Sequence, residues 1–157
     1  MASTLGTVVG LAGIDHGVFE ILQGNAAPDS LMIEAIGPAQ RFWPYGVEPD
    51  LTIVPSFLIT GILAVIVGVA VMVWAIAFID SRYGAWIFLA LALALFLVEG
   101  GFAPIFTAVL ATLTATQMDR PLTWWRRLLP KGTLAVLGRT WHVVLVAFVV
   151  LFLVSVE

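Results

Sequence analysis

An uninterrupted apolar run from Thr52 to Ile79 sets the strongest limit on how this chain can fold. As an α-helix its 28 residues would be about 42 Å long, enough to cross a bilayer with some tilt. The rest of the chain is similar, because 61% of its 157 residues are hydrophobic and only 11% are charged. Soluble domains carry about a quarter charged residues. We therefore expect an all-α integral membrane protein, located in the inner (plasma) membrane of the cell.

The whole chain, residues 1–157, is expected to form a single compact bundle of four or five transmembrane helices. The predicted spans are 5–23, 52–79, 85–99, 105–118 and 140–156, with a loop over 25–50 and an amphipathic interfacial segment over 119–139. Within the proline-rich loop, residues 30–36 are expected to form one or two helical turns.

The number of spans depends on Gly100, Gly101 and Pro104, which interrupt the apolar sequence between Ala85 and Met118. Glycine after a helix and proline at the start of the next are stop and restart signals. One unbroken helix there would be about 51 Å long, more than a bilayer core needs. The chain either kinks at this break, giving four spans, or reverses as a hairpin, giving five. We favour the hairpin because the stop-and-restart signal is complete.

The first predicted helix contains four polar residues, Asp15, His16, Glu20 and Gln23, within an otherwise apolar sequence. His16, Glu20 and Gln23 lie on one helical stripe, and Asp15 points about a quarter-turn away. Ionisable side chains at membrane depth are costly and are candidate sites by default. With Glu99 these residues form the predicted intramembrane polar cluster. It either holds protons or a cation, or it fixes the register of the helices.

Small residues recur at helical spacing in the first two predicted spans. Such stripes let neighbouring helices approach closely, so we expect these two faces to contact one another. The residues are Gly6, Gly10, Gly13 and Gly17 in the first span and Gly61, Ala64 and Gly68 in the second.

Five of the seven basic residues lie between Met118 and Thr140. Because cytoplasmic loops carry an excess of Lys and Arg, we expect this segment to be cytoplasmic. Its aromatic and basic residues are expected to lie at the lipid headgroups, as an interfacial anchor or a site for an anionic lipid. They are Trp124, Trp125, Arg126 and Arg127.

Cofactor chemistry has little support in the sequence. The chain has no cysteine, which excludes thiolate metal sites and disulfides. It also lacks paired Glu-x-x-His motifs, zinc-ligand spacing, phosphate-binding loops and basic nucleic-acid patches. A haem held by His16 and His142 is the remaining possibility, but His142 is predicted near the interface and His16 near mid-depth. We expect no metal and no cofactor.

Four motifs give the chain a family resemblance. They are His16-Gly17-x-x-Glu20-x-x-Gln23-Gly24, then Thr52-Ile-Val-Pro55 followed by Leu58-Ile-Thr-Gly61-Ile-Leu-Ala64, then Gly100-Gly101-Phe102-x-Pro104, and Trp124-Trp125-Arg126. Together they resemble a family of small uncharacterised prokaryotic multi-span membrane proteins. The resemblance covers most of the chain and implies a membrane bundle, without an activity. In layout the chain is also similar to the DoxX-like four-helix proteins.

The sequence favours a non-enzymatic function. Nearly all of its polar residues fit helix packing or interface anchoring, so an accessory or structural subunit is expected, as a homo-oligomer or within a larger membrane complex. Its surroundings would be the lipid bilayer, without a nucleic-acid partner. The alternative is a proton-coupled or cation transporter or channel that uses His16, Glu20 and Glu99. A second alternative is a haem-binding membrane redox protein.

Overall fold

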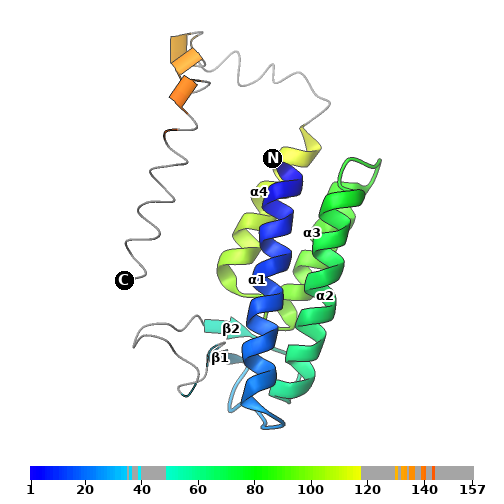
Figure 1. Ribbon diagram of the computed structural model, residues 1–157, viewed down its shortest axis with the longest axis vertical. Helices are drawn as coiled ribbons and strands as arrows, with labels where there is room; N and C mark the ends of the chain where they lie inside the picture. The colour runs from blue at the N-terminus through cyan, green and yellow to red at the C-terminus, as the bar shows by residue number, and fades with distance from the viewer. Residues whose placement is uncertain are drawn as a thin grey trace. The chain divides into compact units, whose positions relative to one another are not determined.

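The computed structural model describes residues 1–34, 36, 39, 49–117, 130, 132, 133, 135, 136, 139, 140 and 143. The chain divides into two units, Met1–Met118 and Asp119–Glu157, and all the elements named below belong to the first. This unit is an all-α four-helix bundle with a small two-stranded sheet at one end (Figure 1). The predicted basic segment 119–139 and last helix 140–156 fall almost entirely outside the described residues.

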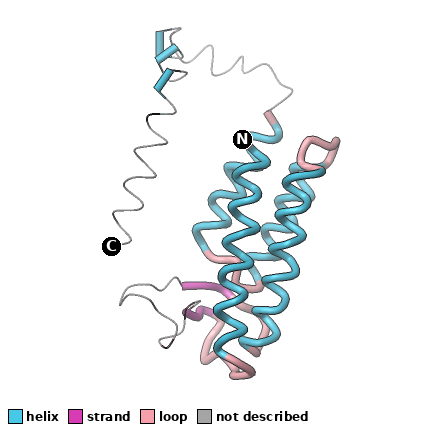
Figure 2. The backbone as a smooth tube through the Cα atoms, in the orientation of Figure 1, coloured by secondary structure: helices cyan, strands magenta, loops and turns pink. Residues whose placement is uncertain are grey.

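The four helices run in alternating directions, side by side (Figure 1, Figure 2). α1 and α2 are both long enough and apolar enough to cross a membrane. α3 and α4 are shorter. The elements in chain order are α1 (Ala2–Gln23), β1 (Met32–Glu34), β2 (Pro49–Leu51), α2 (Phe57–Ala77), α3 (Gly84–Leu97) and α4 (Phe102–Thr116).

α1 and α2 pack through glycines, so that their backbones nearly touch. A Cβ atom on Gly17 would lie 2.6 Å from the carbonyl oxygen of Gly61, and one on Gly10 would lie 2.7 Å from that of Gly68. Separations this short exclude any side chain at these positions. The predicted contact between the two stripes of small residues is therefore confirmed.

α3 and α4 are joined by a tight reversal at Val98–Gly101. The amides of Val98 and Gly100 both donate to the carbonyl oxygen of Leu95, at 3.0 and 2.8 Å, which ends α3. Pro104 lies in the first turn of α4, where its missing N–H costs little. The two helices run in opposite directions, so this break is a reversal and not a kink in one long helix (Figure 1).

The loop over 25–50 contains a sheet where helical turns were expected, so that prediction was wrong. β1 and β2 pair antiparallel, with Ile33 opposite Asp50. The chain after β2 pairs further with the end of α3, because the Ile53 amide donates to the Leu97 carbonyl at 3.1 Å. These long-range backbone hydrogen bonds stabilise extended structure in strands of only three residues each.

The second predicted span begins later in the structure than expected. α2 starts at Phe57, with Ser56 as its N-cap, and the Ser56 hydroxyl accepts from the Ile59 amide at 3.4 Å. Thr52 instead forms a β-bridge with Val98. Part of the apolar run thus belongs to the extended segment that covers one end of the bundle.

Apolar side chains occupy both the inside and the outside of this unit. Phe88, Val71 and Leu95 are among the largest side chains in the core. On the outer faces, Ile66 of α2 and Phe106 of α4 are 59% and 68% exposed. Large exposed apolar patches are typical of surfaces that contact lipid or another protein.

Candidate functional site

A buried polar pair joins α1 to β2. Nδ1 of His16 lies 2.7 Å from Oδ2 of Asp50, and the Asp50 side chain is fully buried. An ionised Asp50 accepts this hydrogen bond from Nδ1–H of His16, whereas a protonated Asp50 donates it to an unprotonated Nδ1. Gly101 leaves room for the ring, since a Cβ atom there would lie 2.7 Å from Cε1 of His16. The turn between α3 and α4 therefore helps to hold the imidazole against Asp50.

Two glutamate side chains form the centre of the site. Glu20 lies one turn after His16 on α1, Glu99 lies in the turn between α3 and α4, and both are 0% exposed. They interact with each other, and the negative charge of Asp50 acts on both. Yet none of their four carboxyl oxygens makes a contact with hydrogen-bond geometry to any described residue. If one of the two carboxyl groups is protonated, it can donate a hydrogen bond to the other.

The backbone of Glu99 is strained as well. Its φ of 77° is left-handed, and among the described residues it is the only positive φ outside glycine. An L-residue other than glycine adopts this conformation at a cost of about 1–2 kcal/mol. The Glu99 amide donates to the Leu51 carbonyl at 3.1 Å, which holds the turn against β2. Glycine would adopt this conformation without the steric cost that the Glu99 side chain carries.

Two threonine hydroxyls lie beside the glutamates. Oγ1 of Thr52 and Oγ1 of Thr60 are 2.8 Å apart, and both residues are buried. Glu99 lies near enough to interact with both of them. Thr60 is in the first turn of α2, so the site receives groups from α1, α2, the segment around β2 and the turn between α3 and α4.

The structure places three of the five residues of the predicted polar cluster together: His16, Glu20 and Glu99. Asp15 is exposed on another face of α1, and the Gln23 side chain donates to the Glu34 carbonyl at 3.4 Å. Sequence reasoning missed three residues of the site, Asp50, Thr52 and Thr60. Asp50 sits in a loop whose composition predicts an extramembrane segment, and only its place just before the long apolar run could have drawn attention to it.

The other predicted site residues divide between the break and the basic segment. Gly100, Gly101 and Pro104 form the reversal beside His16. The interfacial residues and the second histidine of the haem hypothesis lie outside the described residues: Trp124, Trp125, Arg126, Arg127 and His142.

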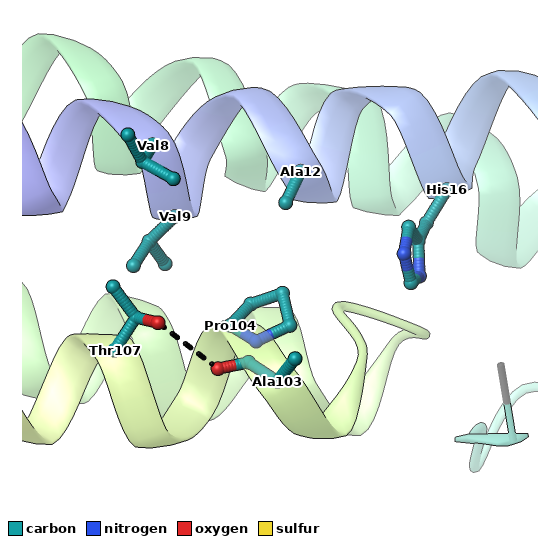
Figure 3. A pocket seen from close by; sticks show the side chains of 7 residues that line it. All are labelled: Val8, Val9, Ala12, His16, Ala103, Pro104 and Thr107. Atoms are coloured by element: carbon teal, nitrogen blue, oxygen red, sulfur yellow. Dashed lines mark hydrogen bonds between the residues drawn. The ribbon is translucent and has the colours of Figure 1, made fainter. Parts of the chain in front are cut away.

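A groove between α1 and α4 extends from His16. It has a volume of about 170 Å³, and Figure 3 shows its seven lining side chains, with His16 at one end. The Thr107 hydroxyl donates to the Ala103 carbonyl at 3.1 Å, so the wall presents mostly apolar surface. The lining residues are Val8, Val9, Ala12, His16, Ala103, Pro104 and Thr107.

The chemistry available to this cluster is set by its charges. α2, α3 and α4 contain no ionisable side chain, so the groups that face one another are His16 and Glu20 of α1, Asp50 of β2 and Glu99. A buried carboxylate without compensation costs several kcal/mol, and removing it from water is favourable only if a proton or a cation neutralises it. The described residues contain no group of three or more His, Asp or Glu suited to a metal ion. Carboxyl and imidazole groups in contact with one another can each bind or release a proton.

The fold and site define a small helical bundle with a buried protonatable cluster at the end where α1 terminates. Comparison with protein-family models, with curated proteins and with solved structures found no match.

Proposed function

We propose that this chain is a multi-pass membrane protein that transfers protons across the bilayer through His16, Glu20, Asp50 and Glu99. The observation that carries the proposal is the Glu20–Glu99 pair, two carboxyl groups that are 0% exposed and lie close enough to interact with each other. Polar groups that fix helix packing in membranes are usually uncharged, as in the Thr52–Thr60 pair. Ionisable groups held inside such a bundle are typical of proton relays.

The backbone strain at Glu99 supports the same proposal over a purely structural subunit. Backbone strain persists only where the surrounding structure holds it, and strained residues cluster at functional sites. A packing role would be served better by glycine in the turn and by an apolar residue in place of Glu20. The accessory role predicted from the sequence therefore explains less of the site.

Membrane insertion is supported by the helices themselves. α1 and α2 have the length and hydropathy of spans, and their outer faces expose large apolar residues. The basic residues of the segment 119–139 favour a cytoplasmic location for it, in the plasma membrane.

A route for the proton is supported by the order of the groups. The Glu20–Glu99 pair lies beside Asp50, and Asp50 contacts His16 at 2.7 Å. His16 in turn borders the groove between α1 and α4. Imidazole exchanges protons near neutral pH, which suits it to pass them between the carboxyl groups and the groove.

The test is proton flux in liposomes. The purified full-length protein is reconstituted around a pH-sensitive dye, and a potassium diffusion potential drives proton entry. Glu20→Gln and Glu99→Gln keep the side-chain volume and remove the exchangeable proton, so flux should fall to that of protein-free liposomes. Glu34→Gln, at an exposed carboxylate of β1, is the matched control and should leave flux unchanged. Wild-type flux in both site variants, or no flux from the wild type, would refute the proposal.

A further inference from the structure

α1 has a second polar feature, on the face that does not line the cluster. Leu11, Val18 and Leu22 are 52%, 45% and 59% exposed, and they share one helical stripe with Asp15, which is exposed too. The described helices contact α1 from the opposite side, through its buried glycines. A single carboxylate thus stands in the middle of an otherwise apolar outer face.

Asp15 lies near the middle of the proposed span, so contact between this face and the lipid hydrocarbon would be unfavourable. In the membrane setting proposed above, Asp15 lies about 4 Å along the axis from the middle of α1, too far from either end to reach headgroups. A carboxylate exposed to hydrocarbon is costly, and such residues nearly always face protein or water. Protein or water in contact with Asp15 is therefore expected on this face.

We propose that this face of α1 binds a membrane-spanning helix of a partner protein that carries a lysine or arginine at the same depth. The inference rests on the proposed membrane location and is independent of proton transfer. Apolar contact with Leu11, Val18 and Leu22 would supply the packing, and the cation would pair with Asp15. A second copy bound by the same face is disfavoured, because its own Asp15 would approach as a like charge. The negative charge of Asp15 thus determines that the partner helix carries a positive charge.

The experiment uses synthetic helices as defined probes. An apolar 22-residue transmembrane peptide with one central lysine is compared with the same peptide carrying leucine or glutamate there. Binding to the full-length protein in liposomes is measured by energy transfer between labels. The lysine peptide should bind at least about tenfold more tightly than the other two, the effect expected of a desolvated charge pair.

Two variants separate the charge from the packing. Asp15→Asn should remove the preference for the lysine peptide, whereas Asp29→Asn, at an exposed aspartate outside the helices, should keep it. Equal binding of the leucine and lysine peptides would overturn the inference. The absence of binding would also overturn it, because the face would then already be covered by this chain or by a second copy. Energy transfer between two labelled copies of the protein would identify the second copy. Proton flux is measured in a separate experiment, so the proposal of proton transfer and the proposal of a partner helix can be refuted independently.

Discussion

Replacing Glu20 by methionine should make the protein more stable and abolish its function. Glu20 is fully buried, and neither carboxyl oxygen has a hydrogen-bond partner among the described residues. A buried polar group left without a partner costs about 1–3 kcal/mol. Methionine is nearly the same size and has similar helix propensity, and repacking it costs less than about 1.5 kcal/mol. The expected net gain in the free energy of unfolding is about 1 kcal/mol.

The measurement is the midpoint of thermal unfolding of the full-length protein in detergent, followed by tryptophan fluorescence. A gain of about 1 kcal/mol should raise the midpoint by about 2–4 °C in a chain of this size. Glu34→Met, the same replacement at an exposed position, should change stability by less than about 0.5 kcal/mol. Proton flux through the Glu20→Met variant should equal that of protein-free liposomes. A lowered midpoint together with normal flux would show that the carboxyl group is structural and that the reasoning is wrong.

Three further changes test other parts of the site. Gly17→Val should lower the free energy of unfolding by at least about 2 kcal/mol, because its Cβ would meet the Gly61 carbonyl at 2.6 Å. The measurement is thermal unfolding, and Gly132→Ala, at a glycine with open space around it, is the control. Gly101→Ala should reduce flux and stability together, because φ there is 76° and His16 occupies the space. Asp50→Asn should slow flux and leave the fold intact, whereas Asp29→Asn should do neither; normal flux in Asp50→Asn would remove Asp50 from the route.

The sequence was sufficient to predict the parts of the fold that depend on local pattern. The spacing of Gly10, Gly17, Gly61 and Gly68 predicted the contact of α1 with α2, because glycine at helical intervals has few other uses. The one-turn spacing of His16 and Glu20 placed both on one face. These features follow from helical periodicity alone.

The features that the sequence did not predict depend on contacts between segments that are far apart in the chain. β1 and β2 contain only three residues each, and they are stabilised by pairing with each other and with the end of α3. Asp50 enters the site on that pairing, so no local property of residues 25–50 could have predicted its role.

The assembly of the cluster from separate segments has a consequence for biogenesis. His16 and Glu20 are synthesised long before Glu99, which lies 79 residues after Glu20 in the chain. During that interval Asp50 and α2 would become available to the first helix, but Glu20 would still lack the turn that carries Glu99. In a membrane, α1 would therefore be expected to settle fully only once the α3–α4 hairpin has emerged, so that a segment made much later completes the burial of the first helix.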